Sequence, residues 1–94
     1  MDKLTSLQPF ALGQTVITAG ASQQLQLEDV IFSLGRHCRC DWGDVCREDR
    51  DENDRSVREG FRLLSAYTDR KGTKFWIITE ADRSVTTVLL PEEY

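Results

Sequence analysis

The chain of 94 residues lacks any apolar run near the roughly 20 residues that a membrane-spanning helix needs. It also lacks a surplus of positive charge, because 12 lysines and arginines stand against 16 aspartates and glutamates, for a formal net charge of −4. This balance argues against direct nucleic-acid binding, which depends on attraction to phosphates. The N-terminal residues lack the hydrophobic segment and cleavage site of a signal peptide, so we expect a cytoplasmic protein without a membrane partner.

Cysteine and histidine are scarce, and those present lie close together. The chain has three cysteines and one histidine, at Cys38, Cys40, Cys46 and His37. An odd, closely spaced set of cysteines is a poor disulfide framework and agrees with reduced thiols in the cytoplasm. Neighbouring His37 and Cys38 would point apart on a helix, and the sequence has no nucleophile elbow or phosphate-binding loop. We therefore expect that the protein is not an enzyme.

Four residues nevertheless offer side chains that can bind zinc: His37, Cys38, Cys40 and Cys46. Structural zinc sites usually space each ligand pair by two to four residues, with a second pair about 12 or more residues further on. Here a single residue separates the first two cysteines. Two alternatives stand: a small zinc-binding domain or enzyme built on residues 37–46, or partly buried cysteines at a helix end with no cofactor.

A single α+β domain is expected over residues 13–94, after a flexible arm formed by residues 1–12. Three runs rich in β-branched and aromatic residues end the chain, FRLLSAYT, TKFWIIT and SVTTVLL, joined by DRKG and EADR. They predict a three-stranded antiparallel β-meander. In the second connection, Arg83 is expected to face solvent or to pair with a carboxylate. The β-branched run at residues 14–18 can add an edge strand.

Helices are expected before the meander, packed on one side of it. Apolar residues recur at helical spacing and share one face of the first long helix: Leu27, Val30, Ile31 and Leu34. Ser22 can cap a shorter helix upstream. Residues 44–59 favour one or two exposed helices, with Asn53 or Asp54 as a cap and Gly60 as the stop.

Residues 44–59 are also the most acidic part of the chain, where seven acidic residues against four arginines leave a net charge of −3. Such a segment is typical of a solvated helix face, or of a surface that meets a positively charged partner. We predict that partner binding uses Asp44, Glu48, Asp49, Asp51, Glu52, Asp54 and Trp42. A second interpretation of Trp42 is that it fills the gap between helix and sheet, while Asp41 accepts a hydrogen bond from His37 or the turn and Gly43 supplies a permissive dihedral.

Four motifs, HxxxDWGD, END, RLLSAY and GTKFWIITEADRSVTTVLLPEEY, resemble a family of small bacterial proteins encoded on plasmids and integrative conjugative elements. Members are sometimes labelled as a type I restriction subunit M, although a methyltransferase needs a doubly wound domain with a glycine-rich cofactor loop. The resemblance covers about residues 11–94. It implies that the shared pattern leaves out Cys38 and Cys40 and keeps His37, Asp41, Trp42 and Gly43.

The resemblance implies a mobile-element context, in which small acidic proteins often block host defence. It predicts a non-enzymatic accessory protein that binds and inhibits a CRISPR–Cas or restriction complex, as an anti-CRISPR or antirestriction protein, through its acidic surface. A homodimer formed through an uncovered sheet face is a further hypothesis.

Overall fold

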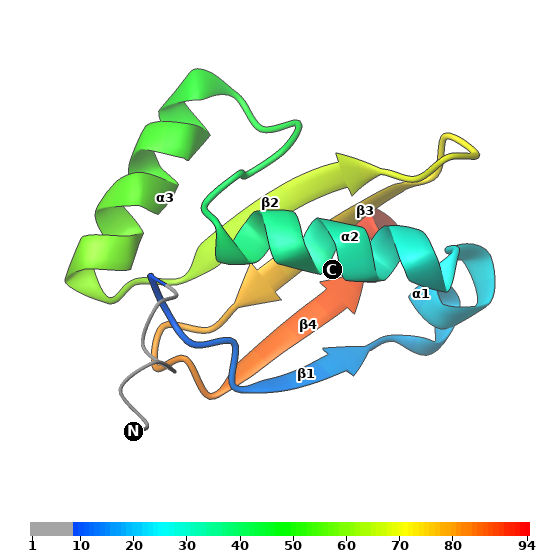
Figure 1. Ribbon diagram of the computed structural model, residues 1–94, viewed down its shortest axis with the longest axis horizontal. Helices are drawn as coiled ribbons and strands as arrows, with labels where there is room; N and C mark the ends of the chain where they lie inside the picture. The colour runs from blue at the N-terminus through cyan, green and yellow to red at the C-terminus, as the bar shows by residue number, and fades with distance from the viewer. Residues whose placement is uncertain (1–8) are drawn as a thin grey trace.

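The computed structural model describes residues 9–94 and has an α+β architecture (Figure 1). Its four strands are β1 at Gln14–Ile17, β2 at Leu63–Thr68, β3 at Lys74–Thr79 and β4 at Val85–Leu89. They form one sheet in the order β1-β4-β3-β2, and the last three make the predicted antiparallel meander. The predicted edge strand is present as well, but it runs parallel to β4, so the sheet is mixed.

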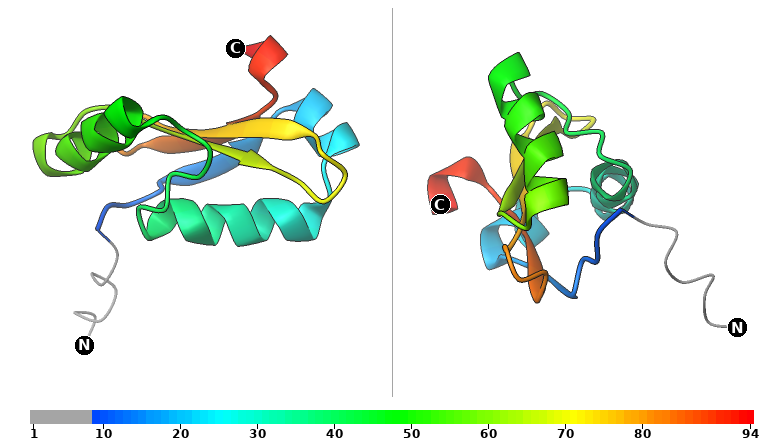
Figure 2. Two further views of the ribbon diagram at one scale, coloured as in Figure 1. Left: turned by 90° about the horizontal axis from the view of Figure 1, so that it is seen from above. Right: turned by 90° about the vertical axis from the view of Figure 1, so that its left-hand side faces the viewer.

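The helices are α1 at Ala19–Gln24, α2 at Leu27–Cys38 and α3 at Arg47–Glu59, with a 3-10 turn, η2, at Pro91–Glu93. Helix α2 lies across one face of the sheet, α3 lies beside the edge strand β2, and η2 lies over the opposite face (Figures 1 and 2). The sheet face opposite α2 is therefore covered less completely than the face beneath α2. Within residues 9–94, no helix is long and apolar enough to cross a membrane.

The helix boundaries differ from the predictions at two caps. Thr18 caps α1 by accepting a backbone hydrogen bond in the first turn, whereas Ser22 lies inside the helix. Helix α3 is continuous, so neither Asn53 nor Asp54 caps it, and Asn53 is buried in its middle. The predicted stop at Gly60 is confirmed, because this residue ends α3 with φ +81°, in the left-handed region that favours glycine.

The buried face of α2 differs from the predicted one. Of the four apolar residues expected to share a face, Leu27 and Ile31 are 67% and 59% exposed. The helix is rotated so that Ser33 and His37 are buried instead. A buried imidazole needs polar partners, and hydroxyl groups of the sheet supply them. Polar pairing, as well as the apolar pattern, thus sets the rotation of this helix.

Two apolar clusters form the core. The larger one lies between α2 and the sheet and includes Tyr67, Phe75, Ile77 and Val88. The smaller one joins Phe10, Trp42 and Leu63. Phe10 falls in the expected flexible arm, residues 1–12, yet it is buried and its ring stacks on Trp42 with 6.2 Å between centroids. The described part of that arm is therefore held against the core, while residues 1–8 lie outside the described residues.

Candidate partner-binding surface

The acidic and basic side chains of α3 lie mostly on different sides of the helix. Helical spacing places four carboxylates, here called the acidic side of α3, along one side: Glu48, Asp49, Glu52 and Glu59. It places three guanidinium groups along the opposite side: Arg47, Arg50 and Arg58. Asp51 and Arg55 lie between the two groups on the solvent-facing surface. The net charge of residues 44–59 is therefore distributed unevenly around the helix.

The interleaved arginines neutralise little of this acidic surface. Two ion pairs are present along the helix, from Arg55 to Glu52 at 3.8 Å and from Arg55 to Glu59 at 3.7 Å. Exposed helix pairs of this kind contribute only about 0.3–0.5 kcal/mol. Within residues 9–94, the exposed carboxylates of Glu48, Asp49 and Asp51 make neither an ion pair nor a side-chain hydrogen bond. Their charge is directed to solvent.

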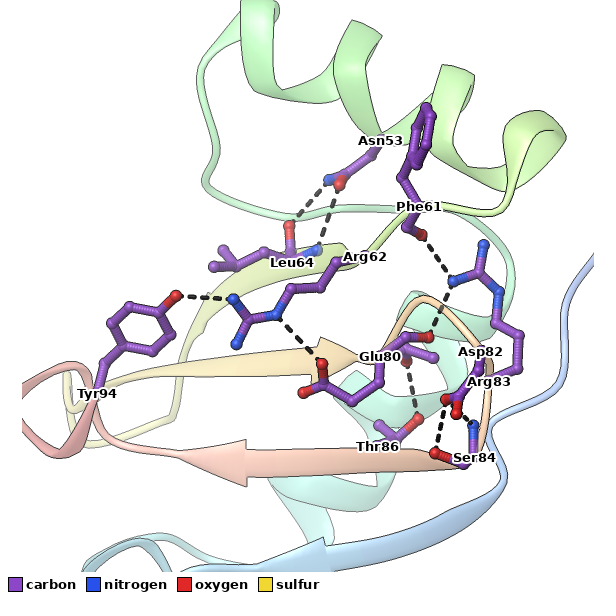
Figure 3. A network of polar contacts seen from close by, with 11 residues as sticks. Asn53, Phe61, Arg62, Leu64, Glu80, Asp82, Arg83, Ser84, Thr86 and Tyr94 are labelled. Atoms are coloured by element: carbon purple, nitrogen blue, oxygen red, sulfur yellow. Dashed lines mark hydrogen bonds and ion pairs between the residues drawn. The ribbon is translucent and has the colours of Figure 1, made fainter.

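The acidic side of α3 borders a cleft of about 220 Å³, lined by Asp49, Glu52, Asn53, Arg62 and Leu64. Asn53 ties the helix to the strand, because its Nδ2 donates to the carbonyl of Leu64 at 2.8 Å and its Oδ1 accepts from the amide of Leu64 at 3.2 Å (Figure 3). Leu64 alternates with buried residues that face α2, so its side chain lies on the opposite face of the sheet. The two-bond link fixes the carboxylates beside this apolar strand surface.

An arginine and two aromatic side chains lie next to this cleft. Nη1 of Arg62 donates to the Tyr94 hydroxyl at 2.8 Å, and its Nε lies 3.6 Å from a carboxylate oxygen of Glu80 (Figure 3). The Tyr94 ring packs edge-on against Trp76, with 5.5 Å between centroids. A second cleft is lined by Trp76 together with Asp44 and residues of β2. The partner-binding residues predicted from the sequence do not include Arg62, Trp76 and Tyr94. The available signal is that side chains on both faces of β3 are apolar, which indicates that the sheet face opposite α2 is also covered or meets a partner.

Some predicted partner-binding residues have internal partners instead. Asp44 accepts a hydrogen bond from the Thr68 hydroxyl at 3.1 Å. Asp54 lies toward the arginine side of α3 and accepts from Nε1 of Trp42 at 2.9 Å. Trp42 itself is only 2% exposed, so the prediction that it contributes to a partner-binding surface is wrong. Its second interpretation, filling a gap in the core, is confirmed.

The turn that contains Trp42 is stabilised locally. The Asp41 carboxylate accepts from Nε of Arg36 at 2.8 Å and not from His37, and this hydrogen bond lowers the pKa of Asp41. Gly43 has φ +76°, and a Cβ atom there would collide with the carbonyl oxygen of Ala66. The permissive dihedral predicted for Gly43 is therefore confirmed, and close approach to β2 is a second reason for glycine.

His37 belongs to a buried network of hydrogen bonds. Its Nδ1 bonds to the Ser65 hydroxyl, and its Nε2 lies 2.8 Å from the Thr79 hydroxyl. Thr79 bonds in turn to the Thr86 hydroxyl at 2.8 Å, which donates to the carbonyl of Leu12 at 2.7 Å. The network crosses strands β2, β3 and β4 and reaches the segment before β1. It links α2 to the whole sheet.

The carbonyl at the end of the network determines the direction of the hydrogen bonds that lead from it back to His37. Because Thr86 donates to that carbonyl, it accepts from Thr79, which accepts from an N–H at Nε2 of His37. The lowered pKa of the buried ring keeps it neutral near pH 7, so Nδ1 carries no proton and accepts from the Ser65 hydroxyl. Burial, together with the nearby charge of Arg83, lowers the pKa of His37 to about 4.

The structure does not bring the four predicted metal ligands together. Both ring nitrogens of His37 bond to hydroxyl groups. Burial raises the pKa of the Cys38 and Cys40 thiols, which disfavours the thiolate that metals and electrophiles need. Cys46 is exposed at the start of α3. Among residues 9–94, no group of three or more His, Cys, Asp or Glu side chains is placed to hold a metal ion.

Arg83 anchors the C-terminal end of α3 rather than facing solvent or a carboxylate. Its guanidinium donates to the carbonyls of Phe61 at 2.7 Å and Glu80 at 3.1 Å (Figure 3). It also donates to the carbonyl of Ser56 at 3.0 Å. The Ser56 carbonyl also accepts from the amides of Gly60 and Phe61 at the end of α3, and a cation there interacts favourably with the negative end of the helix dipole. Arg83 therefore helps to fix the orientation of α3, and with it the acidic side.

Replacing Arg83 with alanine is expected to lower the free energy of unfolding by about 2 kcal/mol, because three carbonyls lose a charged donor. Urea unfolding followed by circular dichroism measures this change. Arg70→Ala is a suitable control, since Arg70 pairs with Asp29 on the surface, where solvent screens the charges, and its loss should cost much less stability. Equal stability of Arg83→Ala and the wild type would contradict an anchoring role.

Comparison of the chain with protein-family models, with curated proteins and with solved structures gives no match. The resemblance to plasmid-encoded proteins thus stays a prediction.

Proposed function

We propose that the chain is a non-enzymatic accessory protein of a mobile genetic element, which binds and inhibits a host CRISPR–Cas or restriction complex in the cytoplasm. The observation that carries this proposal is the acidic surface of α3, where Glu48, Asp49 and Asp51 are exposed and make no ion pair within residues 9–94. Complexes that handle nucleic acid carry basic surfaces. A carboxylate array steers association with such surfaces and fixes its register.

The adjoining cleft supports short-range recognition of the same partner. Asp49 and Glu52 line this cleft and offer carboxylates for an incoming lysine or arginine, while Leu64 offers apolar surface for its aliphatic stem. Asn53 and Arg83 hold the helix in place, so the charges are positioned before the partner arrives. A helix already held in place loses less conformational entropy on binding than a mobile segment would.

A phage interference assay tests this proposal in hosts that carry a defined CRISPR–Cas or restriction complex. Expression of the wild-type chain is expected to restore plaque formation by a targeted phage in at least one such host. The variant Glu48→Lys/Asp49→Lys/Glu52→Lys is expected to lose this effect. With the purified complex, each reversed charge should weaken binding by about 1 kcal/mol, or roughly fivefold.

Glu28→Lys is a matched control for Glu48→Lys. Both residues are acids in the first turn of a helix, so both substitutions remove the same favourable interaction with a helix dipole. Glu28 lies on α2, which crosses a face of the sheet, whereas α3 lies beside β2 (Figure 1). The one ion pair of Glu28 within residues 9–94 is an exposed one with Arg70 at 3.5 Å. Equal effects of the two substitutions on binding would contradict a role for α3, and no protection by the wild type in any of these hosts would contradict inhibition.

A further inference from the structure

Within residues 9–94, the edge of the sheet formed by β2 is covered by other segments of the chain. Along β2, the amide and carbonyl of Leu64 bond to the Asn53 side chain at 3.2 and 2.8 Å. Ala66 donates to the carbonyl of Trp42 at 3.1 Å and accepts from the amide of Asp44 at 2.7 Å. The outward backbone groups of both strand residues are thereby satisfied. Such coverage prevents a further strand from pairing along β2.

Strand β1 forms the other edge, and within the described residues 9–94 no strand or loop pairs with its outer side. The amide of Gln14 donates to the carbonyl of Ser84, just before β4, and the amide of Thr18 donates to the carbonyl of Val88 in β4, each at 3.0 Å. Backbone groups alternate in direction along a strand, so the amides and carbonyls of Thr15 and Ile17 point away from the sheet. Within residues 9–94, none of these four outward groups has a backbone partner outside the strand. They can pair with another strand.

The residues of β1 carry no charge, and just beyond the end of the strand the Thr18 hydroxyl donates to the Glu93 carboxylate at 2.6 Å. No charged residue occurs between Leu4 and Leu27, although charged residues make up 30% of the chain. Strand β1 therefore lacks the lysine or other charged residue that usually guards an exposed edge. Its Val16 and Ile17 side chains are 37% and 40% exposed. Two acidic copies of the chain can approach along this strand without like-charge contact.

Exposed apolar residues of α2 lie on the side of the helix that is nearer to β1. Leu27 and Ile31 are on the opposite side of the helix from Asp29 and Arg36. Asp29 bonds to the turn between β2 and β3, and Arg36 lies over the Tyr67 ring of β2 at 4.9 Å. Leu27 and Ile31 therefore lie toward β1, which runs along the lower edge of the sheet in Figure 1.

We propose that two copies of this chain associate along β1, so that their sheets join into one. Antiparallel pairing centred on Val16 sets Thr15 opposite Ile17 of the partner subunit, and these two residues exchange both of their outward hydrogen bonds. The two-fold axis repeats the pair, which gives four hydrogen bonds. Both copies then carry α2 on the same face of the joined sheet, where Leu27 and Ile31 face the junction.

At the centre of this register, Val16 meets Val16 of the partner subunit on the other face of the sheet. The two Val16 residues form a non-hydrogen-bonded pair, whose side chains lie close together. The acidic side of α3 lies at the far end of the sheet, beside β2, and stays exposed in both copies. Association along β1 thus goes beyond the proposed inhibition and does not depend on it.

Analytical ultracentrifugation of the full chain over a range of concentrations tests this association. The wild type is expected to sediment as a dimer at high concentration. Val16→Lys and Val16→Glu should each raise the dissociation constant about tenfold or more, because two like charges would lie directly opposite one another. An equimolar mixture of the two variants should restore the dimer, since a lysine then faces a glutamate.

Val16→Thr is the matched control, because it keeps an uncharged β-branched residue and should dimerise like the wild type. Circular dichroism checks that each variant is folded. A monomeric wild type at high concentration overturns the proposal. Dimers of Val16→Lys as tight as the wild type, or a mixture that sediments like the separate variants, overturn it as well.

Discussion

Replacing Trp42 with alanine is expected to lower the free energy of unfolding by about 3–5 kcal/mol. The side chain is buried between Phe10, stacked on it at 6.2 Å, and the His37 ring, edge-on at 5.6 Å. Its Nε1 also donates to Asp54 of α3. Truncation would leave a cavity where α2, α3 and the segment before β1 meet, so three parts of the fold lose a shared contact.

Urea unfolding followed by circular dichroism measures the effect. Trp42→Phe is the matched control, because it keeps most of the apolar volume and loses the hydrogen bond to Asp54; a smaller loss of about 1–2 kcal/mol is expected. A Trp42→Ala variant with the unfolding midpoint of the wild type would show that Trp42 is not the structural centre of this junction.

Lowering the pH from about 7.5 to about 5 is expected to reduce the free energy of unfolding by about 2 kcal/mol through His37 alone. The pKa of His37 in the fold is about 4, against 6.5 for the ordinary side chain. Between these two pH values the unfolded chain binds the proton and the folded chain does not. Stability therefore falls as the pH is lowered through this window, and the full loss, reached below the folded pKa, is about 3 kcal/mol.

The carboxylates change the free energy of unfolding in a lower pH range than His37 does, so the two contributions can be separated. Side-chain hydrogen bonds lower the pKa of four of them in the fold: Asp29, Asp41, Asp82 and Glu93. Their stabilising contribution is present above their ordinary pKa and is lost as the pH falls through the lowered value, mainly below about pH 4. The loss between about pH 7.5 and pH 5 thus reports chiefly on His37.

Nuclear magnetic resonance can measure the protonation of the His37 ring directly, because the chain contains a single histidine. The ring resonances should show a neutral ring protonated on Nε2 that titrates near pH 4. His37→Gln should lack the loss of stability between about pH 7.5 and pH 5. A ring that titrates near its ordinary pKa of 6.5 would contradict the buried network, as would an unchanged pH dependence in His37→Gln.

The meander could be predicted from the sequence because its signals are local: β-branched runs joined by short polar connections. The parallel pairing of β1 with β4 could not, since its partners, such as Gln14 and Val85, are far apart in sequence and no connection fixes their register. The rotation of α2 depends on the hydroxyl groups of Ser65 and Thr79, which become partners of His37 only when the sheet forms.

The acidic composition of residues 44–59 indicated the candidate surface, and helical spacing could have separated its carboxylates from its arginines. The cleft could not be predicted in this way. It depends on Asn53 reaching Leu64, and on Arg62 meeting Tyr94 across 32 residues of sequence. Such contacts leave no periodic signal. For Trp42 the sequence allows both a surface role and a core role, and its burial in the structure supports the core role.

The central claim is that the carboxylates of α3 attract a cationic partner, and a titration of the isotope-labelled chain with a hexa-arginine peptide tests it most directly. At low salt, the amide shifts should concentrate on Glu48, Asp49 and Glu52 and on the bordering Leu64, and they should shrink at high salt, because exposed charges are screened. No saturable shifts, or shifts spread evenly over all exposed acids of residues 9–94, would contradict the claim.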